Sequence, residues 1–231
     1  MKNNGTARLA GVCFLLMVVF GIGAEIFFRQ GLIIPGDAAI TVANITAHGL
    51  AFRVGIFSDL LMSLFYLLTA LVLYRLLVEV DKHLSAMMVV FALAGSVLLM
   101  VNVLNEMAPL FVLNESVHLN AFSKEQLQSM VMFNYTAYEH GYMIGQIFFA
   151  LWVLPLGILI MRSTLIPKVL GILFVAETVF GLMAVIVHFV TPNASMETIL
   201  LVPGILAEFF FMFWLLIRGV PMPGRSSLEG A

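Results

Sequence analysis

The sequence predicts an all-α fold: a polytopic membrane protein built as a bundle of six transmembrane helices, with both termini in the cytoplasm. The first reason is composition, because 62% of the 231 residues are hydrophobic and only 10% are charged. A soluble domain is about half apolar and a quarter charged, and a chain of this size cannot bury so much apolar surface in water. The second reason is the number of long apolar runs, and the third is how lysine and arginine are distributed between them.

Six apolar runs are long enough to cross a bilayer, which takes roughly 20 helical residues for about 30 Å of hydrocarbon. They cover residues 8–28, 51–75, 85–113, 132–161, 167–190 and 198–218. We therefore expect one membrane domain over residues 1–220, followed by a short polar cytoplasmic tail over residues 221–231.

The first run could also be a cleaved signal peptide, since Lys2 and Arg8 precede it and Gly21-Ile-Gly-Ala24 has the small residues of a cleavage site. The run nevertheless continues through Phe28 and is long enough to span the membrane. We therefore expect this helix to be retained.

The positive-inside rule sets the expected orientation, because cytoplasmic loops carry an excess of lysine and arginine. If the N-terminus is inside, eight basic residues lie on the cytoplasmic side: Lys2, Arg8, Arg75, Lys82, Arg162, Lys168, Arg218 and Arg225. The opposite side then carries three: Arg29, Arg53 and Lys124. This bias predicts that both termini lie inside (N-in, C-in).

Two of the expected outer loops are long and carry local structure signals. Pro35-Gly36-Asp37 is typical of a turn, and the residues from Asp37 to Ile45 could form a short helix that lies on the membrane. In the second long loop, Ser123 followed three residues later by Gln126 matches a capping box. A helix that leads into the fourth span should therefore begin there.

Composition also excludes several classes of function. A net charge of −2 and the lack of a basic tail make nucleic acid an unexpected partner. The single cysteine, Cys13, excludes an intrachain disulfide and a thiolate metal cluster. The lipid bilayer is the partner that the sequence implies, and the oligomeric state is not predicted.

Several short motifs together resemble a known family. They are Arg8-Leu-Ala-Gly11, Phe52-Arg-Val-Gly55, Ser58-Asp-Leu-Leu61, Ala70-Leu-Val-Leu-Tyr-Arg75 and Asn105-Glu-Met-Ala-Pro-Leu110. With these motifs the chain resembles, over nearly its whole length, the bacterial membrane proteins grouped as domain of unknown function 4386. The resemblance implies six spans in a bacterial inner membrane. It implies no activity, because the family's name records that none is established.

A polar stretch over residues 135–146 opens the fourth apolar run. In a helix, Tyr135, Glu139, Tyr142 and Gln146 share one face, and a polar face inside a membrane is costly without partners. Gly141 and the glycine four residues later form a motif for close helix packing.

Helical rise places polar groups from several spans at one depth. Glu25, Asp59, Asn102 and Gln146 each lie about 24–27 Å from the inner end of their helix at about 1.5 Å per residue. A second group lies a few Å (about one turn) further out: Asn105, Glu106, Glu139, His140 and His188. Polar groups from five helices therefore approach one level.

The expected facing of these residues is partly readable. Asn102, Asn105 and Glu106 share a face of the third span. Arg53 is the basic residue expected at this height, and it could reach Glu25, Glu106 or Glu139, or extend to lipid headgroups.

The polar layer supports a binding or transport protein for a small molecule or a cation, with an outward-facing polar pocket. Its expected ligand-binding residues are Glu25, Arg53, Asp59, Asn102, Asn105, Glu106, Glu139, His140 and Gln146. Two other interpretations of the polar layer stay open. In the first, its side chains only form interhelical hydrogen bonds that hold the bundle together, and the protein is a regulatory or structural membrane subunit. In the second, the carboxylates face the water outside the membrane.

Glu177 and Glu208 form a separate case. Each lies about 14 Å into its span, near the middle of the membrane. They could share a proton, since two close carboxylates do not both ionise easily, either as a proton relay or as a hydrogen-bonded pair.

A membrane-embedded, metal-dependent enzyme of the hydrolase type is the alternative function. His140 and His188, with Glu106 and Glu139, have the ligand types that zinc prefers, and a haem between the two histidines is a further possibility. Two more histidines lie in outer loops: His48 and His118. The sequence has no His-Glu-x-x-His and no Gly-x-Ser-x-Gly motif, so catalytic residues and cofactors stay unassigned.

Overall fold

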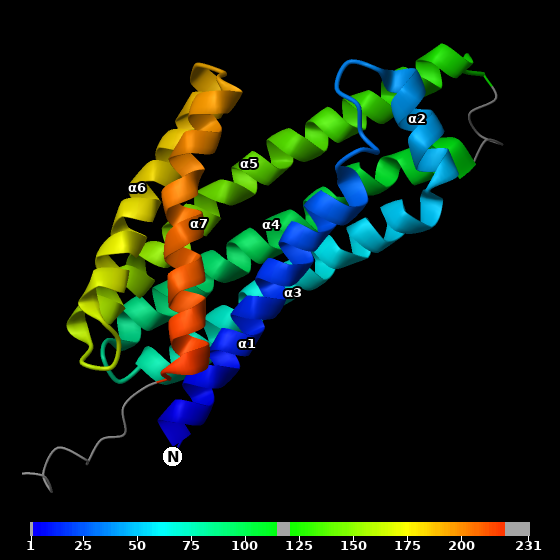
Figure 1. Cartoon of the computed structure of the whole chain (residues 1–231). Helices are drawn as coiled ribbons and strands as arrows, with labels where there is room; N and C mark the ends of the chain where they lie inside the picture. The colour runs from blue at the N-terminus through cyan, green and yellow to red at the C-terminus, as the bar shows by residue number, and fades with distance from the viewer. Residues whose placement is uncertain (1, 115–120, 220–231) are drawn as a thin grey trace, which may run out of the picture. The chain divides into compact units, whose positions relative to one another are not determined.

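The computed structural model describes residues 2–114 and 121–219, and its secondary structure there is helical apart from one isolated bridge between Gln30 and Ile33. The elements are α1 (Lys2–Gly23), the π-helical turn η1 (Ala24–Arg29), α2 (Ala38–Ala47), α3 (Gly49–Leu77), α4 (Lys82–Asn114), α5 (Lys124–Arg162), α6 (Lys168–Val190) and α7 (Ala194–Ile217) (Figure 1). The predicted tail over residues 221–231, with Arg225, and the loop residue His118 lie outside the described residues.

Six of these helices are long and apolar enough to cross a membrane, which confirms the predicted all-α class and the six spans. They are Asn4–Arg29, Gly49–Leu77, Lys82–Leu113, Lys124–Arg162, Lys168–Val190 and Ala194–Ile217. The main difference from the predicted bounds is α5, which begins eight residues before the expected span at residue 132. The protein is therefore a multi-pass membrane protein, while its orientation stays a prediction.

Local sequence signals begin two helices where expected. At the start of α5, the backbone N–H of Ser123 donates to Oε1 of Gln126 (2.8 Å), and the backbone N–H of Gln126 donates to Oγ of Ser123 (3.3 Å). This reciprocal pair is the predicted capping box. At the start of α2, the Asp37 carboxylate accepts from the backbone N–H of Ile40 at 2.9 Å, which satisfies a first-turn donor.

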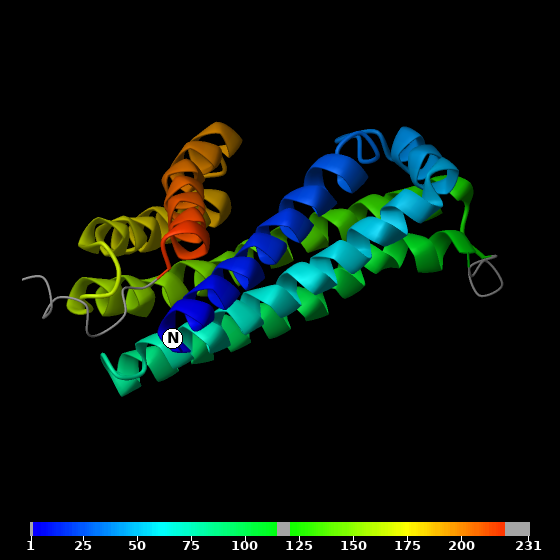
Figure 2. The same ribbon diagram turned by 60° about the horizontal axis from the view of Figure 1, so that its bottom comes forward.

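The turn before α2 also follows from sequence. The backbone N–H of Asp37 donates to the carbonyl of Ile34 (3.0 Å), and Gly36 has φ of 81°. Proline followed by a glycine with positive φ is the pattern of a type II turn. Asn44 of α2 then donates to the carbonyl of Leu32 (3.2 Å), and Figure 2 shows α2 beside the segment that follows η1.

The chain divides into two compact units. Among the described residues, the central unit comprises residues 16–64, 96–114 and 121–145, and the terminal unit comprises residues 2–15, 65–95 and 146–219. Each of α1, α3, α4 and α5 contributes one part to each unit. The prediction of a single domain over residues 1–220 stays a prediction.

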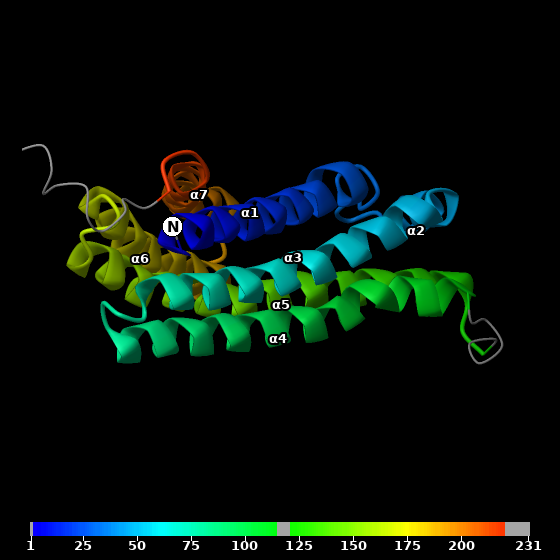
Figure 3. The same ribbon diagram turned by 90° about the horizontal axis from the view of Figure 1, so that it is seen from below.

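The central unit packs η1, α2 and the parts of α3, α4 and α5 that belong to it. Its apolar core consists of Ile45, Phe52, Ile56, Val103, Leu110, Val112 and Val131. In Figure 3 the α4 and α5 segments lie side by side. Glycine allows this approach, because a Cβ at Gly141 would overlap the side-chain amide of Asn102, and one at Gly145 would lie 2.8 Å from Cδ2 of Leu99. The predicted close-packing motif is confirmed.

The terminal unit has an aromatic core. Phe14 of α1 makes edge contacts with Trp152 of α5 and Phe211 of α7, at centroid distances of 6.4 and 6.1 Å. Edge-to-face geometry is favourable for such pairs. The backbones of α5 and α6 also approach closely, since a Cβ at Gly157 would lie 2.7 Å from the carbonyl oxygen of Gly171.

Candidate functional site: a buried arginine among carboxylates

Arg29 lies at the end of η1, where the first spanning helix changes from α to π geometry. The π turn is closed by the backbone N–H of Gln30, which donates to the carbonyl of Glu25 at 2.8 Å. The extra residue in such a turn changes the direction of the side chains that follow, and π turns are frequent at functional sites. The Arg29 side chain is buried here, with 6% of its surface exposed.

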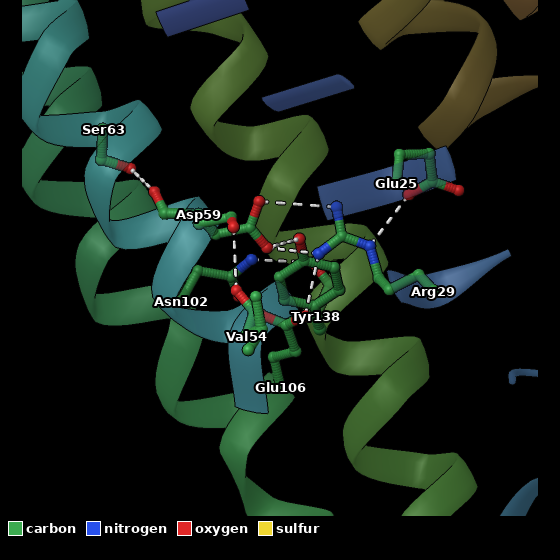
Figure 4. Close-up of polar contacts among 9 residues, drawn as sticks. Glu25, Arg29, Val54, Asp59, Ser63, Asn102, Glu106 and Tyr138 are labelled. Carbon is green, nitrogen blue, oxygen red and sulfur yellow. Dashed lines mark hydrogen bonds and ion pairs between the residues drawn. The ribbon is translucent and has the colours of Figure 1, made fainter. Parts of the chain in front are cut away.

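The guanidinium of Arg29 meets three carboxylates from three spanning segments (Figure 4). Its Nε lies 2.9 Å from Oε2 of Glu25, and its Nη1 lies 2.8 Å from Oε1 of Glu106. Nη1 also contacts Oδ2 of Asp59, and Nη2 lies 3.5 Å from Oδ1 of the same residue. A planar fork of five N–H donors suits this multiple pairing.

Tyr138 of α5 completes what we name the Arg29 cluster: Glu25, Arg29, Asp59, Glu106 and Tyr138. Its hydroxyl donates to Oδ2 of Asp59 at 3.1 Å. Its ring centroid lies 5.4 Å from Cζ of Arg29, within the range of a cation–π interaction. Tyr138 therefore contacts both the cation and one of its anions.

Neighbouring polar residues hold the cluster's backbone in place. Nδ2 of Asn102 donates to the carbonyl of Tyr138 at 2.8 Å, and Nδ2 of Asn105 donates to Oδ1 of Asn102 at 3.1 Å. On α3, Oγ of Ser63 donates to the carbonyl of Asp59 at 2.9 Å. These bonds connect α4 to α5 and fix the turn of α3 that carries Asp59.

The enclosed part of the cluster contains more acid than base. The Asp59 and Glu106 side chains are 5% and 0% exposed, whereas that of Glu25 is 55% exposed. One enclosed guanidinium therefore faces two enclosed carboxyl groups. Oε2 of Glu106 is buried and has no hydrogen-bond partner. A buried polar atom without a partner costs free energy, so this oxygen is where an additional proton or cation would be stabilised.

Comparison with protein families identifies one family for this chain. The family model described as Domain of unknown function (DUF4386) matches residues 9–219. The chain belongs to this family. No curated protein and no solved structure shows significant similarity to it.

Arg29, and not Arg53, is the basic residue of the cluster in this DUF4386 protein. Arg53 is exposed and forms no ion pair with any described residue. The charge distribution of the sequence places Arg29 in the outer loop, because a helix of ordinary pitch gives no reason to bury it. The spacing of Glu25 and Arg29, four residues apart, is the one sequence signal that could have indicated the pair.

Tyr138 also differs from expectation, because α5 buries a face next to the predicted one. Glu139 is exposed and Tyr142 is 38% exposed, whereas Tyr138 is 7% exposed. Adjacent helical residues diverge by about 100°, so the burial of Tyr138 turns Glu139 away from the cluster. The apolar residue Val131, two turns earlier and fully buried, indicates the buried face.

The remaining predicted site residues differ in burial and in their position relative to the Arg29 cluster. Asn102 is buried and Asn105 is partly buried, both beside the cluster; His140 is exposed. Gln146 is partly buried and belongs to the terminal unit.

The predicted metal pair is divided between the units. His140 belongs to the central unit and His188 to the terminal unit, where its Nδ1 lies 2.9 Å from Oε2 of Glu197. Within residues 2–114 and 121–219, no three His, Cys, Asp or Glu side chains are grouped as a metal site requires. The metal site stays a prediction without a defined set of ligands.

Two shallow surface hollows lie away from the predicted site residues. One is lined by Phe122, Glu125, Gln126, Ser129 and Met130 of the central unit. The other is lined by Thr164, Leu165, Ile166, Pro167, Trp214, Arg218 and Gly219 of the terminal unit. Of the carboxylates predicted to line an outward pocket, Glu25, Asp59 and Glu106 contact Arg29, whereas Glu139 is exposed on α5.

Proposed function

We propose that this DUF4386 protein binds and transports a small monovalent cation across the bacterial inner membrane, with Asp59 and Glu106 as the binding carboxylates. The proposal is carried by Oε2 of Glu106, which is buried without a hydrogen-bond partner. Ionisable groups inside membrane spans are rare and mark ion pathways or substrate sites. Arg29 then serves as the protein's own cation, which occupies the site when no other cation is bound.

The pairing of Arg29 favours a cationic over an anionic ligand. Its Nε, Nη1 and Nη2 are all directed at carboxylates of Glu25, Asp59 and Glu106. An anion would have to displace one of these carboxylates and would add negative charge to a cluster that already has an excess of acid. A cation at the free oxygen of Glu106 reduces that excess instead.

Exchange between Arg29 and an incoming cation supplies a transport step. Breaking a buried ion pair by removing one partner costs roughly 3–5 kcal/mol, so Arg29 leaves Asp59 and Glu106 only when another cation replaces it. Glu25, with 55% of its side chain exposed and its carboxylate 2.9 Å from Nε of Arg29, can keep the displaced guanidinium paired. We place the entrance on the outer side, as the positive-inside rule predicts.

Substitution of Glu106 by Gln tests this function. The purified protein is reconstituted into liposomes with an imposed membrane potential, and the initial uptake of H⁺ and Na⁺ is measured with an entrapped pH dye and with radioactive sodium. We expect wild-type uptake of one of these ions and at least about a tenfold lower rate in Glu106→Gln, because a charge-assisted contact is worth about 1.5–3 kcal/mol and 1.4 kcal/mol is about a factor of ten.

Glu79→Gln is the matched control, since it removes the same charge from an exposed loop residue and should transport like wild type. Asp59→Asn provides a second variant if Glu106→Gln lowers the melting temperature in detergent. Wild-type vesicles that take up neither ion faster than empty vesicles would refute the proposal. So would folded Glu106→Gln and Asp59→Asn variants with wild-type rates, which would leave the cluster a structural role.

A further inference from the structure

Two contacts fix how α6 and α7 are aligned in the terminal unit. Near one end, Nδ1 of His188 lies 2.9 Å from Oε2 of Glu197. Further along, the rings of Phe174 and Phe211 make an edge contact with a centroid distance of 5.0 Å. The two helices run in opposite directions along the chain, so residues between these contacts face each other in a regular order. Figure 1 shows α6 and α7 side by side.

This alignment places Glu177 opposite Glu208. Glu177 follows Phe174 by three residues, and Glu208 precedes Phe211 by three, so both lie one turn from the aromatic contact in the same direction. Glu177 also precedes His188 by eleven residues, and Glu208 follows Glu197 by eleven. Eleven residues are about three full turns at 3.6 residues per turn, so both glutamates lie on the faces that already meet.

Gly204 supplies direct evidence that the Glu177 side chain packs on α7. A Cβ at Gly204 would lie 2.7 Å from Cγ and 3.0 Å from Cδ of Glu177. The side chain of Glu177 therefore occupies the space that this glycine leaves free. Gly204 precedes Glu208 by four residues, hence by one turn on the same face, which places the Glu177 carboxyl beside that of Glu208.

Within residues 2–114 and 121–219, neither of these two carboxyl groups forms an ion pair with a basic residue. Oε2 of Glu177 is buried and has no hydrogen-bond partner. Each glutamate lies nine residues, about 14 Å, from one end of its helix: Glu177 from Lys168, and Glu208 from Ile217.

The neighbouring helices of the terminal unit bring no cation to this level. Between residues 146 and 161, α5 has no charged residue, and its terminal Arg162 pairs with Asp81. The first-helix segment 9–15 contributes only Cys13 as a titratable group. Tyr66 of α3 is fully buried, and its hydroxyl donates to the carbonyl of Phe148 at 3.3 Å. The remaining basic groups among the described residues of this unit lie at or near helix ends: Lys2, Arg8, Arg75, Lys82, His83, Lys168, His188 and Arg218.

We propose that Glu177 and Glu208 form a proton-binding site between α6 and α7. One proton is held on a carboxyl oxygen of one glutamate, and this O–H donates to the ionised carboxylate of the other. Two adjacent carboxylates without a cation do not both ionise easily, and a charge at mid-membrane is costly. The proton arrives from water and returns to water, and no other bond changes. This site and the Arg29 cluster have no residue in common. The proposed proton site can therefore be tested independently of the proposed transport.

Labelling with dicyclohexylcarbodiimide tests the site. This apolar reagent adds to an un-ionised carboxyl group as an O-acylisourea, which rearranges to a stable N-acylurea that peptide mass spectrometry locates. At pH 7 we expect modification of Glu177 or Glu208 in the wild-type protein in detergent, and none at the exposed Glu79. In Glu208→Gln, the pH at which Glu177 is half labelled should fall by about one unit or more, because the like charge is removed and an amide donor stabilises the carboxylate.

Three results would overturn the proposal. The first is wild-type labelling of both glutamates no greater than that of Glu79. The second is an unchanged half-labelling pH of Glu177 in Glu208→Gln. The third is protection of the wild-type protein by Na⁺ at constant pH, which would make this a sodium site. If Glu208→Gln fails to fold, Glu177→Gln provides the reciprocal measurement on Glu208.

Discussion

At the scale of single residues, burial and not charge alone distinguishes the role of Arg29 from that of Arg53. Arg29 and Arg53 are both basic residues near one end of a spanning helix, yet Arg29 is 6% exposed and Arg53 is exposed. A buried guanidinium must have partners, and Arg29 has three carboxylates. The same substitution at the two positions should therefore have very different consequences.

We expect Arg29→Gln to lower the free energy of unfolding by about 3–5 kcal/mol, because it leaves Asp59 and Glu106 as uncompensated buried acids. Denaturant unfolding in detergent, followed by tryptophan fluorescence, measures this loss. Arg53→Gln is the control and should stay within about 0.5 kcal/mol of wild type, as exposed substitutions usually do. Equal effects at the two positions would contradict the burial of Arg29.

The residue scale is also where sequence reasoning was least complete. Helical rise predicts Glu25 and Asp59 at one depth and Glu106 about one turn further out, and all three contact Arg29. The same arithmetic could not choose Tyr138 over Glu139, because the buried face of α5 depends on which helices surround it. It could not identify Arg29 either, since a π turn is a departure from regular pitch that composition does not encode.

At the scale of helices, the sequence predicts correctly those features that depend on a single local rule. The six spans follow from the length of apolar runs, and the starts of α2 and α5 follow from the side chains of Asp37, Ser123 and Gln126, which satisfy first-turn backbone groups. Pairing of helices depends on close contacts such as Gly204 against Glu177, which sequence reasoning did not identify. Such contacts make individual glycines sensitive to substitution.

Gly204→Ala should destabilise the protein by about 1–3 kcal/mol, because the added methyl would lie 2.7 Å from Cγ of Glu177 and overpacking costs about that much. The melting temperature in detergent reports the change. Gly5→Ala in α1 is the control and should not lower the melting temperature. A Cβ there meets nothing within 4 Å, and alanine is a better helix former than glycine by about 1 kcal/mol. A Gly204→Ala protein as stable as wild type would contradict the packing of Glu177 on α7.

At the scale of the whole molecule, some contacts join segments that are far apart in the chain. In the terminal unit, Asp81 precedes α4 and Arg162 ends α5, and Nη1 of Arg162 donates to Oδ2 of Asp81 at 2.7 Å. Asp81 also accepts from the backbone N–H groups of Leu84 (3.1 Å) and His83 (3.0 Å). The backbone hydrogen bond from Leu84, then that from His83 and the charge of Arg162, hold the pKa of Asp81 below its ordinary value of 3.8.

A lowered pKa makes the stability of the protein depend on pH. Asp81 contributes stability above its unfolded pKa, near 3.8, and this contribution is lost as the pH falls through the lower folded pKa. We expect the melting temperature to fall below about pH 4 by more in the wild type than in Asp81→Asn, which keeps a capping side chain but does not titrate. Glu79→Gln should follow the wild-type curve. Parallel curves for wild type and Asp81→Asn would contradict this prediction.

The π turn over Ala24–Arg29 has a consequence for which mutations this segment tolerates. A hydrogen bond that spans five residues includes one residue more than an α turn. Deletion of a single residue between Glu25 and Arg29 would remove this extra residue and restore regular pitch. Arg29 would then follow Glu25 by three residues instead of four, and both spacings place two side chains on one face of a helix. The segment Ile26-Phe27-Phe28 is therefore expected to tolerate the loss of one residue better than a segment of regular α pitch, where a deletion would rotate every following helical side chain by about 100°.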